Sequence, residues 1–198
     1  MRIACSLGSL LSVEQVIECT KMISETNIDS IWIPETWGME NFSMLGAVSS
    51  ETKSQKIGSS IINIYSRSPS TISMGAATTD ILSNGRLILG LGTSSVPIVE
   101  DFHGNEFKTP VQRMREYVEI IRLSLSKKQI NYSGKIFNLK NFTLLIKPKR
   151  QSIPIYLAAI NQRMVNLAWE LGDGVIFYLR PLDEMKKTIS KMQSERKI

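Results

Sequence analysis

The chain has 198 residues, 42% of them hydrophobic and 21% charged, and carries a formal net charge of +6. This composition is that of a globular domain able to bury its own core, and it excludes disordered and collagen-like chains. The longest apolar runs, 87–91 and 153–160, are too short to span a bilayer, so no membrane association is expected. Cys5 and Cys19 match neither metal-ligand nor disulfide spacing, which favours reduced thiols and a cytoplasmic location.

The positive charge is concentrated in one region, 127–152. It contains seven basic residues and no acidic one, so the rest of the chain carries −1 (6 − 7): Lys127, Lys128, Lys135, Lys140, Lys147, Lys149 and Arg150. Such a patch could bind an anionic ligand or a nucleic acid, or it could be a solvated surface hairpin. Ordinary surface use of lysine favours the hairpin. No nucleic-acid motif accompanies the patch, so no nucleic-acid partner is expected.

The first third of the chain alternates strands with helices. Residues 3–7 are interpreted as a first strand, since the run is short and no small-residue cleavage site follows it. Ser12 and Gln15 form a capping box that begins a helix. The stripe predicted to be buried on that helix comprises Val13, Val16, Ile17 and Ile23. A strand over 30–33, a helix around 43–51 and a strand over 56–61 follow.

The stretch 58–95 is the most informative. After the strand, Ser68-Pro69 supplies an N-cap and a proline at the first helical position, and Asn84-Gly85 ends the helix. The apolar stripe of this helix is Ile72, Ala76, Thr79 and Leu82. Residues 87–91 form the next strand, which opens into a Gly-Thr-Ser-Ser loop. This β-α-β unit predicts ligand-binding loops at the carboxyl edge of a parallel sheet.

The remaining elements continue the pattern. After a loop over 92–108, Thr109-Pro110 begins a helix with one apolar face and one polar face. The apolar face comprises Val111, Met114, Val118, Ile121 and Leu125, and the polar face comprises Arg113, Arg115, Glu116, Glu119 and Arg122. A turn at Ser133-Gly134 predicts a hairpin inside the basic region. A strand over 154–158, a helix over 162–171, a strand over 174–178 and a helix from Pro181 follow.

Six consecutive βα units predict a parallel sheet with right-handed crossovers. Two architectures fit this pattern: an open doubly wound sheet and a (β/α)₈ barrel. The first strand-helix turn lacks the G-x-G-x-x-G pattern of a dinucleotide-binding fold, while six units are two short of a closed barrel. Periodicity alone does not choose between them.

Five segments of the chain, in order and spacing, resemble the bacterial-luciferase-like superfamily. They are GSSIINIYSRSP, NGRLILGLGTSS, FKTPVQRMREYVEIIR, NYSGKIFNL and IPIYLAAINQRMVNLAWELGDGVI. Within it the chain is most similar to the branch dependent on coenzyme F-420 (8-hydroxy-5-deazaflavin), which includes methylenetetrahydromethanopterin reductases. The resemblance implies one barrel domain over 1–198, partial after about six βα units, with 127–152 inserted before the fifth strand. The chain is expected to be either a fragment of a longer protein, which is favoured, or a reduced relative with a shortened barrel. The full-length form is expected to be a homo-oligomer.

The resemblance also implies where a cofactor binds. Relatives carry a non-prolyl cis peptide bond at the position of Ser60-Ile61, against the middle ring of the cofactor. Gly92, Thr93 and Ser94 then offer backbone N–H groups and hydroxyls to its polar edge. The segment Ala158, Ala159, Asn161 and Gln162 joins a strand to a helix. Its small residues would admit the cofactor next to the backbone, and the N-terminus of the helix favours the cofactor phosphate. FMN is the alternative cofactor.

Glu35 is the candidate catalytic residue, as a proton donor or a substrate contact. Glu35 and Thr36 stand where deazaflavin relatives often carry an Asp-His pair, so the chain departs from that pattern. The sole histidine, His103, has no cysteine or second imidazole near it in sequence, so no metal site is expected.

Together these features predict an oxidoreductase that transfers a hydride between the C5 atom of the deazaflavin and a small organic substrate, such as a methylenetetrahydromethanopterin. Two alternatives stand beside this prediction. One is an FMN-dependent luciferase-like monooxygenase, and the other is a non-catalytic flavin-binding or subunit homologue.

Overall fold

The sheet runs through the molecule in chain order. The computed structural model describes residues 2–8, 10–126, 129–146, 148–150 and 152–195. The strands lie in this order, each parallel to the next: β1 (Ala4–Ser6), β2 (Ser30–Ile33), β3 (Lys56–Ser59), β5 (Leu87–Gly92), β8 (Ile155–Ala158) and β9 (Gly174–Ile176). The two-residue β4 (Ile62–Asn63) pairs with the carboxyl end of β5. Since the strand order never reverses, the sheet is that of a partial (β/α) barrel and not of a doubly wound fold.

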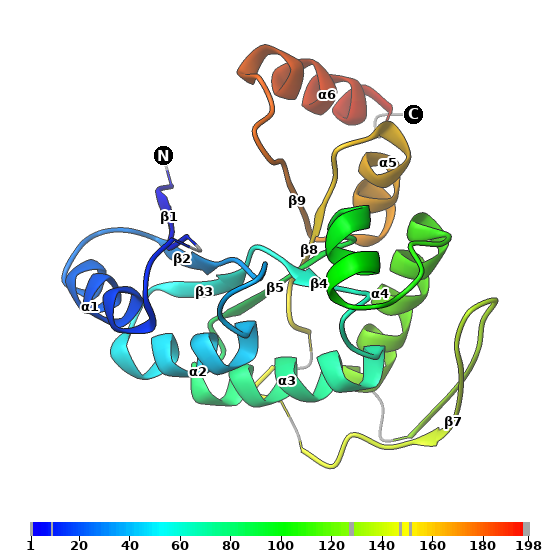
Figure 1. Cartoon of the computed structure of the whole chain (residues 1–198), viewed down its shortest axis with the longest axis horizontal. Coiled ribbons are helices and arrows are strands. Elements are labelled where there is room, and N and C mark those ends of the chain that lie inside the picture. Colours follow the sequence, from blue (N-terminus) through cyan, green and yellow to red (C-terminus); the bar gives the residue numbers. More distant parts are fainter. Residues whose placement is uncertain (1, 9, 127–128, 147, 151, 196–198) are drawn as a thin grey trace.

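Helices cover the outer side of the curved sheet (Figure 1). Consecutive helices pack against one another around it: α1 (Val13–Ser24), α2 (Asn41–Glu51), α3 (Pro69–Leu82), α4 (Pro110–Ser126) and α5 (Gln162–Leu171). The last helix, α6 (Leu182–Glu195), lines an apolar groove of about 350 Å³ together with α5 and β9. Because helices follow strands at the carboxyl edge of the sheet, their N-termini lie at the same rim as the strand ends.

Local signals in the sequence explain where several helices begin and end. In α1, the Ser12 hydroxyl accepts from Gln15 N while the Gln15 side chain accepts from Ser12 N, which confirms the capping box. In α3, Ser68 caps the first turn, and Gly85, with a φ of 81°, donates to Asp80 O at the end. A φ in this range suits glycine, which has no Cβ to clash with the backbone.

Val13 was predicted to be buried, but it is 47% exposed, so that prediction was wrong. Leu82, on the apolar stripe of α3, is 58% exposed. Both residues lie in the terminal turn of their helix. The loop predicted over 92–108 also contains a short π-helical turn, η1 (Ile98–Phe102), which periodicity did not indicate.

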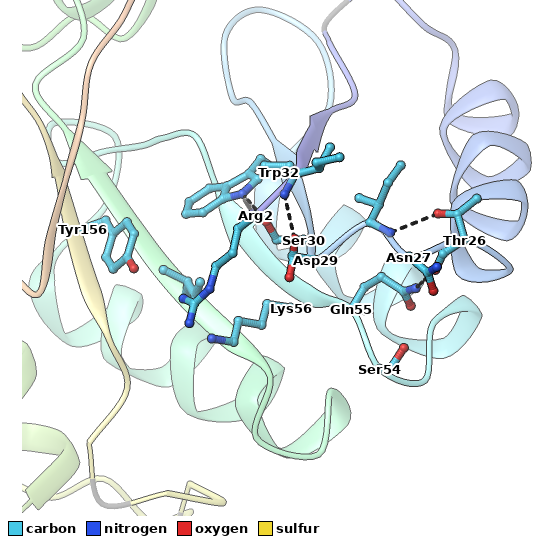
Figure 2. A pocket seen from close by; sticks show the side chains of 14 residues that line it. Arg2, Thr26, Asn27, Asp29, Ser30, Trp32, Ser54, Gln55, Lys56 and Tyr156 are labelled. Carbon is cyan, nitrogen blue, oxygen red and sulfur yellow. Dashed lines mark hydrogen bonds between the residues drawn. The ribbon is translucent and has the colours of Figure 1, made fainter. Parts of the chain in front are cut away.

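Aromatic side chains line the inner side of the sheet (Figure 2). Trp32 and Tyr156 lie with their ring centroids 5.8 Å apart, and both line a cavity of about 550 Å³. Each ring covers a glycine of the adjacent strand: a Cβ on Gly58 would lie 2.5 Å from Trp32, and a Cβ on Gly174 would lie 2.8 Å from Tyr156. Glycine at these two positions therefore lets large rings pack flat on the inner side.

The basic region forms the predicted hairpin, β6 (Ile130–Ser133) and β7 (Asn138–Phe142), joined by a turn. Glu116 of α4 holds that turn. Its carboxylate accepts hydrogen bonds from the backbone N–H groups of Lys135, Ile136 and Phe137 and from the Gln112 side chain. Glu116 was predicted on the polar face of the helix, but it is 1% exposed. The hairpin turn supplies the donors that make its burial possible.

Arg150 corrects the interpretation of the basic region as a wholly solvated surface. Its guanidinium reaches Asp80 of α3 at 2.5 and 3.0 Å and also donates to Leu87 O. Asp80 is fully buried, so Arg150 neutralises an acid within the core. Of the remaining basic residues in this region, Lys127, Lys128 and Lys147 lie outside the described residues.

Candidate active site

The centre of the strand-end rim is the junction between β3 and β4. The peptide bond Ser60-Ile61 is cis, as the resemblance predicts. Ser60 N donates to Ile33 O at the end of β2, at 2.8 Å, which ties the junction to the neighbouring strand. The Ser60 Oγ and Asn63 Nδ2 atoms are buried and have no hydrogen-bond partner within the part of the chain that the structure describes. Two buried polar atoms at this rim thus lack a partner among the described residues.

Gly92 brings three strand ends together. A Cβ on this glycine would lie 2.6 Å from the Ile61 side chain and 3.3 Å from the Ala158 Cβ. Ile61, Gly92 and Ala158, which the sequence placed far apart along the chain, therefore meet at one point of the rim. Gly92 is buried and Ala158 half-buried, and the Ile61 side chain fills the space above Gly92. The absence of a Cβ at Gly92 therefore lets Ile61 pack closely against β5 and β8.

The loop after β5 continues the rim. Thr93 and Ser94 are half-buried, and Ser94 has a φ of 58°, in the left-handed region. On the next strand along, Ala159 is buried and its N–H donates to Ile176 O at 3.1 Å. The Ala159 backbone is therefore engaged in the sheet, while the hydroxyl-bearing loop remains partly open to solvent.

Asn161 and Gln162 lie at the N-terminus of α5, and both are exposed. Asn161 caps the helix by accepting from Met164 N at 3.0 Å, and the Gln162 side chain donates to Asn166 at 2.7 Å. Both side chains thus make contacts within their own helix. What this position offers a ligand is the positive end of the helix dipole.

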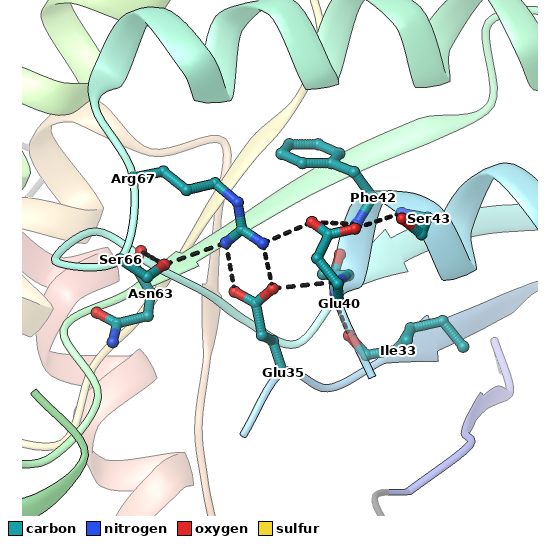
Figure 3. Close-up of polar contacts among 9 residues, drawn as sticks. Ile33, Glu35, Glu40, Phe42, Ser43, Asn63, Ser66 and Arg67 are labelled. Carbon is teal, nitrogen blue, oxygen red and sulfur yellow. Dashed lines mark hydrogen bonds and ion pairs between the residues drawn. The ribbon is translucent and has the colours of Figure 1, made fainter. Parts of the chain in front are cut away.

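Glu35 follows β2 and is held by Arg67, which follows β4 (Figure 3). The two guanidinium nitrogens reach the two carboxylate oxygens at 2.6 and 2.7 Å, and Asn41 N donates to the same carboxylate at 3.0 Å. The Glu35 and Arg67 side chains are 11% and 16% exposed. The arrangement is a bidentate charge-assisted pair, the strongest kind of hydrogen-bonded contact between side chains.

Arg67 also contacts a second carboxylate. One of its nitrogens donates to Glu40, the N-cap of α2, whose oxygens also accept from Phe42 N and Ser43 N. Burial would raise the pKa of Glu40, but its hydrogen bonds with Ser43 and Phe42 and the Arg67 charge outweigh burial and lower it. Hydrogen bonding to Glu35 raises the pKa of Arg67. The positive charge of the Arg67 guanidinium thus lies between the carboxylates of Glu35 and Glu40.

The matching family model now identifies the chain. The model described as luciferase-like monooxygenase matches residues 2–197. The chain belongs to the luciferase-like monooxygenase family.

Curated relatives of this luciferase-like chain include reductases and F-420-dependent dehydrogenases. A 5,10-methylenetetrahydromethanopterin reductase of Archaeoglobus fulgidus is 36% identical over 157 residues, covering 79% of this chain and 46% of the relative. An F-420-dependent glucose-6-phosphate dehydrogenase of Amycolatopsis mediterranei is 29% identical over 188 residues, covering 86% of this chain and 56% of the relative. The chain therefore spans about half the length of these relatives.

Solved structures share the fold. The coenzyme F-420-dependent tetrahydromethanopterin reductase of Methanopyrus kandleri superposes with a TM-score of 0.90 at 21% identity, covering 99% of this chain and 61% of that one. A Baeyer-Villiger monooxygenase component from Pseudomonas putida, in complex with FMN, superposes with a TM-score of 0.83 at 16% identity, covering 98% and 62%. At these identities the likeness establishes the partial luciferase-like barrel and nothing further.

The rim residues fit a flavin or deazaflavin. The packed side chains of Ile61 and Ala158 at Gly92 could support a flat ring system, and Ser60 Oγ and Asn63 Nδ2 are groups without a partner among the described residues that could bond to the polar edge of such a ring. Among the described residues, no group of three or more His, Cys, Asp and Glu side chains could hold a metal ion. In the same residues, no helix combines the length and apolar character needed to cross a membrane.

Two residues of this luciferase-like site were missed from the sequence, Asn63 and Arg67. A signal for Arg67 was present, because it is the only basic residue between Lys56 and Arg86 and lies directly before the Ser68 N-cap. A charge at the end of an apolar strand indicates a polar partner nearby. Nothing in the sequence distinguished Asn63 from an ordinary strand-end residue.

Proposed function

We propose that this chain binds coenzyme F-420 at the rim formed by β4, β5 and β8 and serves an oxidoreductase reaction on a small organic molecule. The observation that carries the proposal is the contact of Gly92 with Ile61 and Ala158 beside the unpaired Ser60 and Asn63 atoms. The F-420-dependent dehydrogenase among the relatives supports the choice of cofactor. When bound, the deazaflavin would supply hydride transfer at C5; the protein supplies binding and orientation.

Each part of the rim has its own role in this proposal. Gly92 lets Ile61 pack close to β5, and Ile61 and Ala158 support the ring. Ser60 Oγ and Asn63 Nδ2 bond to its polar edge, together with the hydroxyls of Thr93 and Ser94. The N-terminus of α5, with Asn161 and Gln162, favours the negative charge of the cofactor phosphate.

We propose Glu35 as a substrate contact. Both of its oxygens already accept hydrogen bonds from Arg67, which fix the position of the carboxylate. Such a group accepts hydrogen bonds and orients a substrate. As a proton donor it would first have to give up these contacts.

An FMN-dependent reaction is the second candidate, supported by the FMN complex of the Pseudomonas putida neighbour. Titrating the purified chain with coenzyme F-420 and with FMN, each followed by its own fluorescence, separates the two. Tighter binding of coenzyme F-420 supports the proposal, and tighter binding of FMN overturns it. Binding without turnover of any substrate would favour the non-catalytic role. The homo-oligomer and the cytoplasmic location remain predictions.

A further inference from the structure

A cavity of about 250 Å³ lies beside the rim, between the segments that follow β2 and β4 and the turn η1. Its walls include Glu35 and Glu40, the Arg67 guanidinium between them, and the aromatic residues Trp37, Phe102 and His103. Figure 3 shows the three charged side chains converging from separate segments. The volume would hold a single small ring system.

The charges of this wall do not suit an anion. Arg67 is the only Lys or Arg among the cavity's lining residues, and its guanidinium nitrogens already donate to Glu35 at 2.6 and 2.7 Å and to Glu40 at 2.5 Å. One cation facing two carboxylates leaves an excess of one negative charge. A phosphate or carboxylate entering here would be repelled and would find the guanidinium fork engaged.

The same wall can still accept hydrogen bonds. A carboxylate offers about four lone-pair sites. Glu35 accepts from Asn41 N and twice from Arg67, and Glu40 accepts from Phe42 N, Ser43 N and Arg67. Each carboxylate therefore keeps about one acceptor site for an N–H or O–H group of a ligand.

The aromatic side chains give the rest of the cavity an apolar surface. Trp37 is 68% exposed and Phe102 is 54% exposed, and both line this cavity. His103 packs edge-on against Phe102, with centroids 4.9 Å apart. Large aromatic rings left open beside a small cavity offer flat surfaces for another ring.

We propose that this cavity is the substrate subsite and that it selects an uncharged or cationic ring bearing N–H or O–H donors, against phosphorylated or carboxylated substrates. The inference rests on the proposed function, because the cofactor rim makes the neighbouring cavity a substrate site. The substrate expected for this chain therefore differs from glucose 6-phosphate, the sugar phosphate in the name of the Amycolatopsis relative. Glu40 is the specificity-determining residue, since it accepts a hydrogen bond from the Arg67 nitrogen Nη2, which also donates to Glu35.

The test is calorimetric titration of the purified chain with two probes, pterin as an uncharged donor-bearing ring and glucose 6-phosphate as an anion. Pterin is expected to bind at least tenfold more tightly. Trp37→Ala should weaken pterin binding at least fivefold, while Leu145→Ala, which removes an exposed apolar side chain on the basic region, should leave it unchanged. Glu40→Gln should strengthen glucose 6-phosphate binding at least threefold, because it removes one of the two negative charges that face Arg67.

Three results would overturn the inference: undetectable pterin binding, glucose 6-phosphate binding as tight as pterin, or no gain of anion binding in a folded Glu40→Gln variant. Circular dichroism on every variant confirms the fold. A coenzyme F-420 titration on the same sample, without either probe, tests the proposed function separately. Failure of the coenzyme titration overturns the proposed function and with it the assignment of the cavity as a substrate subsite, whereas failure of the pterin arm alone overturns the inference and leaves the cofactor site standing.

Discussion

Arg67 and Glu35 are 32 residues apart in sequence and follow two different strands. They form a bidentate ion pair, in which the two guanidinium nitrogens lie 2.6 and 2.7 Å from the two carboxylate oxygens. The same arginine accepts a hydrogen bond at its backbone oxygen from the Tyr117 hydroxyl of α4, and burial raises the pKa of Tyr117 to about 12. Tyr117 therefore stays a donor across the physiological range. Through Arg67, the segments after β2 and β4 are joined to α2 and α4.

Removing Arg67 should destabilise the protein substantially. Arg67→Leu leaves the nearly buried Glu35 carboxylate without its counter-charge, which costs about 3 kcal/mol of unfolding free energy. Arg115→Leu is the matched control, because the Arg115–Glu170 pair is also bidentate but its side chains are 32% and 54% exposed. That change should cost at most about 1 kcal/mol. Urea unfolding measures both, and equal losses would contradict the importance assigned to Arg67.

Glu116 should make stability depend on acid pH. Burial would raise its pKa, but hydrogen bonds from Gln112 and the backbone of Phe137, Ile136 and Lys135 outweigh burial and lower the pKa below its usual value of 4.5. The folded chain therefore favours the carboxylate more than the unfolded chain does. The resulting stabilisation is present above about pH 4.5 and is lost as the pH falls through the folded-state pKa.

The check compares Glu116→Gln with the wild-type chain by urea unfolding at pH 7 and at acid pH. The variant should lose about 2 kcal/mol at pH 7, since an amide N–H₂ replaces one acceptor, and the difference should shrink as the pH falls. Glu18→Gln, on the exposed side of α1, is the control and should change little. A difference that stays constant with pH would contradict the role of the Glu116 charge.

The contact between Arg150 and Asp80 should anchor the basic region to the barrel. Arg150→Met leaves the fully buried Asp80 without its guanidinium and should cost about 3 kcal/mol. Lys149→Met, one residue earlier and exposed, should change stability by less than about 0.5 kcal/mol. Thermal unfolding of both variants distinguishes an anchored insertion, as found here, from a merely solvated one, in which the two variants would behave alike.

The sequence predicted elements whose signals are local. The helix over 162–171 matches its prediction to the residue, and the Ser12–Gln15 capping box is present, because both depend on short-range spacing. The burial of Glu116 could not be predicted, since the hairpin that satisfies it comes about twenty residues later in the chain. Periodicity treats any glutamate as exposed.

The candidate site also combines features that depend on short sequence motifs with contacts that depend on the fold. The Gly-Thr-Ser-Ser loop and the position of the cis bond were identified because each is a short motif of the family. The contact of Arg67 with Glu35 joins two strand ends, and it depends on how the sheet curves. Only the folded arrangement shows that one arginine serves two acids, so the acceptor character of Glu35 emerged from the structure.

The most direct test of the cofactor site is a fluorescence titration of coenzyme F-420 against the chain and three variants. Wild type and Gly46→Ala, whose new Cβ would lie 3.8 Å from Leu82 within ordinary contact, should bind alike. Gly92→Val should bind at least tenfold more weakly, because its Cβ would lie 2.6 Å from the Ile61 side chain and displace it, and Ser60→Ala should weaken binding about threefold. No binding by wild type, or unchanged binding by folded Gly92→Val, would contradict the account.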